Sequence, residues 1–400
     1  MAAQSLFVAI PAMDEWESLP LTLHDLAAQE DAPTFEVHIC VNQPEHYWSL
    51  PDKREICDRN QQTLQYLRQY QGLSLHVLDR ASQGQGWPVR RQGVGWARKT
   101  LFDHILTRAA DQDLIVSLDA DTHVTPRYLH SVATTMACHP EWPALAVPYY
   151  HPLTGEEWQD RTILRYEIYM RNYALNLLRI GSPYSFTALG SAIVMRAGAL
   201  RKIGGITPVQ SGEDFYLLQK FRKMAPIGLY NEVPVFPSAR LSDRVPFGTG
   251  PAIAKGRHGD WESYPVYHHT HFDSIADTYR QLSQLYREDV ATDFLVFLQK
   301  QFNEEQLWDK IRQNVTDFEH FERAFHQKAD GLRILQYLRQ RHREQPCPDE
   351  TALFDNLTMW IPDRLPDWYT AERSFDEFTV AQLDHLRALL YELENEWRKN

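Results

Sequence analysis

The first part of the chain alternates short apolar runs with amphipathic helical patterns, and this order restricts the fold more than any other feature. The apolar runs are residues 6–10, 35–41, 73–78 and 113–118. Their length and apolar character are typical of strands that are buried on both faces. The alternation therefore predicts an α/β domain with a mostly parallel sheet flanked by helices. Ligands of such sheets bind at the carboxyl ends of the strands.

Two carboxylates, Asp119 and Asp121, follow the fourth apolar run directly. Side chains alternate along an extended chain, so both point the same way. Like charges so close repel unless a cation or a shared proton neutralises them, and carboxylate oxygens suit Mg²⁺ or Mn²⁺. The pair predicts a metal-dependent enzyme that acts on a phosphorylated or nucleotide-linked substrate. The alternative is a solvated acidic turn.

The composition excludes several classes of protein. The 400 residues carry a net charge of −12 without a block of Lys and Arg, so we expect no nucleic-acid partner. The four cysteines are scattered without metal-binding spacing, which favours reduced thiols in the cytoplasm over disulfides. We expect neither a signal peptide nor a transmembrane segment, while peripheral membrane contact and the oligomeric state stay open.

The character of the chain changes near residue 273, where strand patterns end and helical periodicity takes over. We expect a catalytic domain over residues 1–272 and an all-helical C-terminal region over residues 273–400. Residues 237–259 are rich in glycine and proline and are predicted to form a long flexible loop.

Three motifs in order resemble family 2 glycosyltransferases, whose catalytic domain has the GT-A fold. They are VAIPAMDEWESLPLTL, DLIVSLDADTHV, and GSAIVMRAGALRKIGGI followed by SGEDFYL. The resemblance covers about the first two-thirds of the chain. It implies that a sugar is transferred from a nucleotide-diphosphate donor to the hydroxyl of an acceptor. The identities of the sugar, the base and the acceptor are not readable from the sequence.

The resemblance also implies roles for the acidic residues. Asp121 is the expected ligand of Mn²⁺ or Mg²⁺, and Asp119 either assists it or contacts the donor's ribose. Asp214 is the expected general base of an inverting reaction, while Glu213 positions the acceptor or a loop. The alternative for this second pair is ordinary first-turn carboxylates that face a helix dipole.

The donor pocket is expected at the ends of the first two strands. Pro11, Ala12 and Glu15 follow the first strand, and Asn42 follows the second, where the family often has an acidic residue. The alternative for Asn42 is the capping of a turn.

Basic residues in two glycine-rich segments are candidates for contacts with the diphosphate. Arg91 is one, and Arg240 and Arg244 are two more, in the predicted loop. His258 is the candidate for a further metal ligand. Solvated arginines in a flexible turn and a surface histidine are the alternatives.

Two other classes of function remain open at this point. A nucleotidyltransferase also needs two carboxylates and a metal but releases pyrophosphate, and a scaffold protein with this fold would show no turnover.

Overall fold

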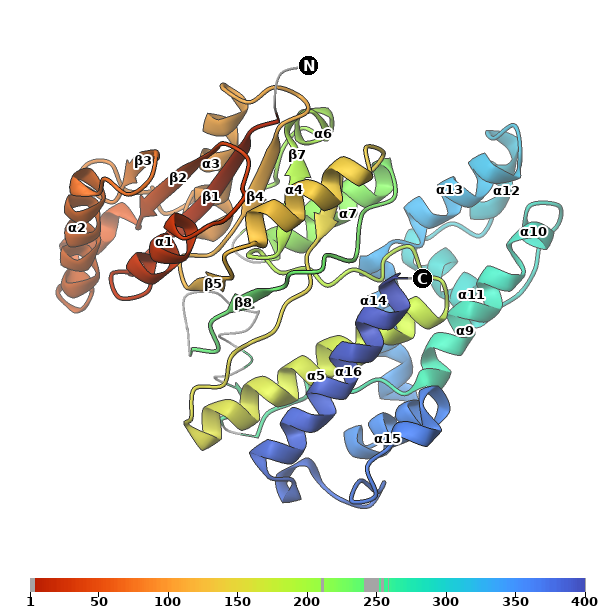
Figure 1. The fold of residues 1–400 in the computed structure, drawn as a ribbon. Helices are drawn as coiled ribbons and strands as arrows, with labels where there is room; N and C mark the ends of the chain where they lie inside the picture. The colour runs from red at the N-terminus through yellow and green to blue at the C-terminus, as the bar shows by residue number, and fades with distance from the viewer. Residues whose placement is uncertain (1–3, 210–211, 241–251, 253–254, 258, 400) are drawn as a thin grey trace. The chain divides into compact units, whose positions relative to one another are not determined.

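A computed structural model describes residues 4–209, 212–240, 252, 255–257 and 259–399 (Figure 1). The chain forms two compact units. The first comprises Met1–Ile163 and Phe186–His258, and the second comprises Leu164–Ser185 and Gly259–Asn400. The boundary falls inside the helix α5 (Glu157–Arg179), so each unit contains one part of that helix.

A six-stranded sheet forms the centre of the first unit, in the order β3-β2-β1-β4-β7-β6. The strands β1, β2, β3 and β4 are mutually parallel, and β7 is antiparallel to both β4 and β6. The bounds are β1 Leu6–Ala12, β2 Phe35–Asn42, β3 Leu75–Arg80, β4 Leu114–Ser117, β6 Ala144–Ala146 and β7 Ile193–Arg196.

Helices shield this sheet from solvent, as the uninterrupted burial of β1 and β4 shows. Apolar residues occupy both faces of these strands because each face has helices to pack against. The helices are α1 Leu19–Ala27, α2 Arg54–Gln69, α3 Val94–Leu106, α4 Tyr128–Cys138, α6 Ala197–Lys202 and α7 Glu213–Met224, with short 3₁₀ turns at Glu45–Ser49 and Pro51–Lys53.

A second, two-stranded sheet joins β5 (Thr122–Val124) to β8 (Val235–Pro237). The apolar pattern of residues 227–231 also predicts a strand, and that prediction is wrong. The segment makes a single bridge, between Gly228 and Leu145 of β6. Because β6 spans only three residues, it offers little edge for further pairing.

The described part of the second unit is helical. The second part of α5 packs against two C-terminal helices through a shared apolar core that includes Leu164, Ile168, Leu357 and Leu390. The helices are α9 His269–Arg280, α10 Leu282–Leu285, α11 Asp293–Phe302, α12 Leu307–Gln313, α13 Phe318–Lys328, α14 Gly331–Glu344, α15 Asp349–Trp360 and α16 Val380–Lys399, with 3₁₀ turns at Pro362–Arg364 and Phe375–Glu377.

The predicted fold class, a mostly parallel sheet flanked by helices and followed by a helical region, is therefore confirmed. Across the described ranges, no helix has the length and apolar character needed to cross a bilayer.

Candidate active site

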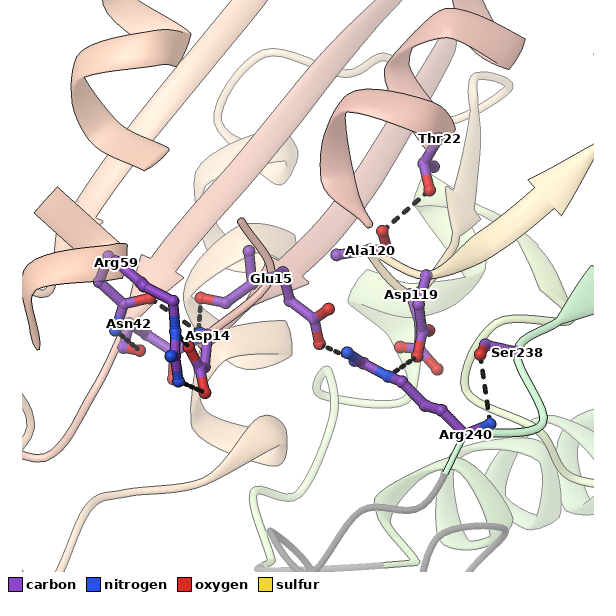
Figure 2. A network of polar contacts seen from close by, with 12 residues as sticks. Asp14, Glu15, Thr22, Asn42, Arg59, Asp119, Ala120, Ser238 and Arg240 are labelled. Atoms are coloured by element: carbon purple, nitrogen blue, oxygen red, sulfur yellow. Dashed lines mark hydrogen bonds and ion pairs between the residues drawn. The ribbon is translucent and has the colours of Figure 1, made fainter. Parts of the chain in front are cut away.

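The acidic pair predicted from the sequence lies where β4 ends. Asp119 and Asp121 flank Ala120, which is buried, and the Thr22 hydroxyl of α1 donates a hydrogen bond of 2.9 Å to the Ala120 carbonyl oxygen (Figure 2). The Thr122 amide donates to the Asp119 carbonyl oxygen at 3.1 Å and closes a turn. These contacts fix the backbone that carries both carboxylates at the carboxyl edge of the sheet.

Arg240 reaches this pair because of the small sheet. Asp121 comes directly before β5, and Arg240 lies three residues beyond Pro237, which pairs with Thr122. The Arg240 Nε donates to Asp121 Oδ2 at 2.7 Å. Its Nη2 donates to Glu15 Oε1 (Figure 2). Burial opposes the charged guanidinium, but the two carboxylates outweigh that effect and raise the pKa of Arg240.

A second guanidinium, that of Arg98 on α3, joins the two acidic motifs. Its Nη2 donates to Asp119 Oδ1, and its Nη1 donates to Glu213 Oε1 in the first turn of α7. The side chains of Arg98 and Glu213 are 5% and 3% exposed, whereas that of Asp119 is 36% exposed. Arg98 and Glu213 thus form a buried ion pair, and the Asp119 carboxylate remains accessible to solvent.

Close contacts at two glycines place α3 against the segments that contain Val209 and Gly190. A Cβ at Gly95, in the first turn of α3, would lie 2.3 Å from the carbonyl oxygen of Val209, four residues before Glu213. A Cβ at Gly190 would lie 1.9 Å from Arg98 Nη2. Only glycine fits at these two positions, since the neighbouring atoms are a backbone carbonyl and a guanidinium held by two carboxylates.

Asp214 differs from its neighbour Glu213 in its electrostatic surroundings. Burial raises the pKa of Asp214 to about 7, with further contributions from the negative charges of Glu213 and Asp119 that exceed the opposing effect of Arg98. The Phe215 amide donates to Asp214 Oδ1 at 2.7 Å. A carboxyl group of this pKa exchanges its proton near neutral pH, as a general acid or base must.

The ends of β1 and β2 are tied together by Asn42. Its Nδ2 donates to the Ala12 carbonyl oxygen at 3.0 Å, and its Oδ1 accepts from Trp87 Nε1 at 3.3 Å. Pro11 and Ala12 are the last two residues of β1 and are buried. The Asn42 amide therefore fixes the end of β1 and the Trp87 side chain beside the predicted donor pocket.

Beyond β1, Asp14 adopts a left-handed conformation with φ 61°. Its carboxylate accepts two hydrogen bonds from Arg59, of which that from Nη2 is 2.8 Å, and its amide donates to Asn60 Oδ1 at 2.9 Å (Figure 2). These contacts fix the turn that leads from β1 to Glu15.

The remaining predicted residues lie elsewhere. Arg91 is exposed, and its guanidinium lies 5.4 Å from the centre of the Trp96 ring. Arg244 and His258 lie outside the described residues.

Sequence reasoning did not identify Arg98, although a pattern for it exists. Arg98, Leu101, Phe102 and Ile105 follow helical spacing and are buried on one face of α3. A charged side chain on an apolar helix face needs a buried partner of opposite charge. That rule would have singled out Arg98 in place of the more conspicuous Arg91.

The donor set of the site fits a divalent cation of the Mg²⁺ or Mn²⁺ type. Asp119 and Asp121 supply hard carboxylate oxygens, and the Asp119 side chain is accessible. The guanidinium groups of Arg98 and Arg240 compensate part of the same negative charge. The negative charges of Asp119 and Asp121 can therefore be balanced by a bound cation as well as by these arginines.

Comparisons with known proteins give distant matches to solved structures alone. No protein-family profile matches the chain, and no curated protein matches it. Solved glycosyltransferase structures superpose on it. One is S. aureus TarS 1–349, with a TM-score of 0.42 and 12% identity over 99% of this chain and 90% of that one.

The same TarS fragment in complex with UDP-GlcNAc gives a TM-score of 0.41 and 14% identity over 99% of this chain and 91% of that one. GalNAc-T7 with UDP, GalNAc and Mn²⁺ gives 0.37 and 14% over 82% and 57%. These superpositions are too distant to decide the function. Membership of family 2 stays a prediction.

Proposed function

We propose that the protein is a glycosyltransferase that moves a sugar from a nucleotide-diphosphate donor to an acceptor hydroxyl with inversion. The observation that carries this proposal is the Arg98 bridge, which unites the acidic residues after β4 with the acidic pair of α7. Such a transfer needs two acidic groups, one near the leaving diphosphate and one near the acceptor hydroxyl.

The environments of Glu213 and Asp214 support different roles for them. Glu213 is the buried partner of Arg98, and this ion pair stabilises its negatively charged form and makes it a weaker base. Asp214 has a pKa near 7 and is the better base at neutral pH. In the proposed reaction, Asp214 takes the proton of the acceptor hydroxyl, whose oxygen forms a bond to the anomeric carbon while the bond to the diphosphate breaks.

The leaving diphosphate requires positive charge on the opposite side of the reaction. Asp121, with Asp119, would hold Mn²⁺ or Mg²⁺, which supplies charge stabilisation for the leaving group. Arg240 already binds Asp121 and Glu15 and is placed to exchange one of these partners for a phosphate oxygen. Pro11, Ala12 and Asn42 would support the nucleotide, and Asp119 would contact its ribose in place of the ion if Asp121 alone holds the metal.

The rival classes differ from this proposal in their products. Glycosyl transfer releases a nucleoside diphosphate, a nucleotidyltransferase releases pyrophosphate, and a scaffold protein releases neither. Incubation with a panel of nucleotide-sugars, Mn²⁺ and candidate acceptors, with assays for both products, tests the proposal. Pyrophosphate release without nucleoside diphosphate would overturn it.

Asp121→Asn is expected to abolish the metal-dependent part of donor binding. The substitution keeps the shape of the side chain but removes the charge that would hold the cation. Isothermal titration calorimetry with a panel of nucleoside diphosphates, in Mn²⁺ and in EDTA, measures this difference. Wild-type protein should bind more tightly in Mn²⁺, whereas the variant should bind equally in both.

Asp103→Asn is the matched control because Asp103 is an exposed carboxylate on α3 that pairs with Lys99. It should behave as wild type. An Asp121→Asn protein that keeps the full effect of Mn²⁺ would show that the cation binds elsewhere.

A further inference from the structure

Three histidines from separate elements of the first unit converge at a place that the proposed reaction does not use. They are His38 on β2, His76 on β3 and His104 on α3. One nitrogen from each ring lies within 4.8 Å of the nitrogens of the other two.

The sheet register produces the first half of the cluster. His38 is paired with His76 across the parallel strands β2 and β3, and their rings stack with centroids 4.5 Å apart. The His104 ring approaches from the helix, with its centroid 5.3 Å from that of His38. All three side chains are thus fixed by regular secondary structure.

The burial of His38 is unusual for a polar side chain. The residue is 0% exposed, its Nδ1 has no hydrogen-bond partner among the described residues, and its Nε2 faces the Glu36 carboxylate at 3.3 Å. His104 Nε2 is also buried without such a partner. A buried polar atom left without a hydrogen bond costs about 1–3 kcal/mol, so the arrangement requires a compensating interaction.

One carboxylate borders the cluster. Glu36 Oε2 lies 3.3 Å from His38 Nε2 and 3.2 Å from His76 Nε2. Glu36 is also bound by Arg108, whose Nη2 lies 3.1 Å from Oε1. Glu36 therefore lies beside both rings, where a carboxylate can orient imidazoles that bind a metal ion.

We propose that His38, His76 and His104 form a binding site for a divalent transition-metal ion, with Zn²⁺ the best match. Imidazole nitrogens suit Zn²⁺, and three protein ligands leave a fourth position for water. Bonds of about 2.0–2.1 Å place tetrahedral ligand atoms about 3.3 Å apart, so the rings close inward on binding. His76, whose side chain is 29% exposed, gives the ion its route from solvent.

This site is distinct from the acidic one. His38 and His76 precede the carboxyl ends of their strands, Asn42 and Arg80, by four residues each, about 13 Å along a strand. His104 is near the C-terminal end of α3, whereas Arg98 is six residues earlier on the same helix. A bound ion would clamp the helix that carries Arg98 onto β2 and β3, which is a structural role.

Thermal unfolding of the tag-free full chain tests the proposal, because an ion that binds only the folded state raises its melting temperature. After EDTA treatment and dialysis, Zn²⁺ should stabilise wild-type protein. His76→Gln and His104→Gln should lose this shift, and their affinity for Zn²⁺ should fall at least about 100-fold. Co²⁺ should give visible bands of imidazole coordination in wild-type protein only.

Two control variants make the result specific. His24→Gln removes an exposed histidine of α1 and should keep the Zn²⁺ shift. Asp121→Asn should keep it as well, which separates this ion from the one proposed for the acidic site. The proposal is overturned if wild-type protein shows no Zn²⁺ shift, or if both histidine variants retain it while unfolding cooperatively in EDTA.

Discussion

Asp214→Asn is expected to lower kcat by about 10²–10⁴-fold, the usual contribution of a general base. The substitution is nearly isosteric, and the Phe215 amide still finds an oxygen acceptor at this position. Donor binding should therefore stay within a few-fold of wild type. The measurements are steady-state release of nucleoside diphosphate for kcat and calorimetry for the affinity of the donor.

Glu213→Gln is the matched comparison, because it removes a neighbouring negative charge that is already paired with Arg98. We expect a smaller loss of kcat from it than from Asp214→Asn. A Glu213→Gln variant that loses more activity than Asp214→Asn would exchange the roles of the two residues. Near-normal turnover in Asp214→Asn would remove it from the reaction.

The pH dependence of the wild-type enzyme provides an independent check. Burial and neighbouring negative charges raise the pKa of Asp214 to about 7, so the carboxyl group keeps its proton below that pH. The protonated form cannot accept the acceptor's proton, and the rate should rise as pH increases through about 7. This limb of the profile should be absent from the residual activity of Asp214→Asn.

The positions of Asp119 and Asp121 in the fold could be predicted from the sequence, whereas the residues that contact them could not. Asp119 and Asp121 follow a strand whose apolar run is unmistakable, so their place at the carboxyl edge could be predicted. The partners of these residues could not. Arg240 is 119 positions from Asp121 and reaches it through strands of three residues, which are too short to show a periodic pattern.

Arg98 illustrates the opposite case, in which the local pattern existed but the partner was remote. Its position on the apolar face of α3 indicates burial, yet Glu213 lies 115 residues away. Helical periodicity predicts which face of a helix is covered but not by what. The close approach of α3 to the segment before α7, which requires Gly95, is a property of the folded chain alone.

Arg98→Met is expected to lower the free energy of unfolding of the first unit by about 3–5 kcal/mol. Methionine fills a similar volume but leaves Glu213 buried without its partner, and removal of one member of a buried ion pair exposes the other to the full cost of desolvation. Pulsed hydrogen exchange of peptides from α3 and β4 along a urea titration follows this unit separately.

Arg98→Met with Glu213→Gln should recover most of that loss, because the buried Glu213 position is then uncharged, while the Asp119 carboxylate, 36% exposed, is solvated by water. If Arg98 also positions the catalytic groups electrostatically, the pH profile of the rate gives a second measurement. Arg98 lowers the pKa of Asp214, so its removal should move the rising limb of the pH profile to higher pH, provided the rate is measured in conditions that keep the variant folded. If Arg98→Met matches wild type in both stability and pH profile, the Arg98 bridge has neither a structural nor an electrostatic role, and the union of the two acidic motifs loses its basis.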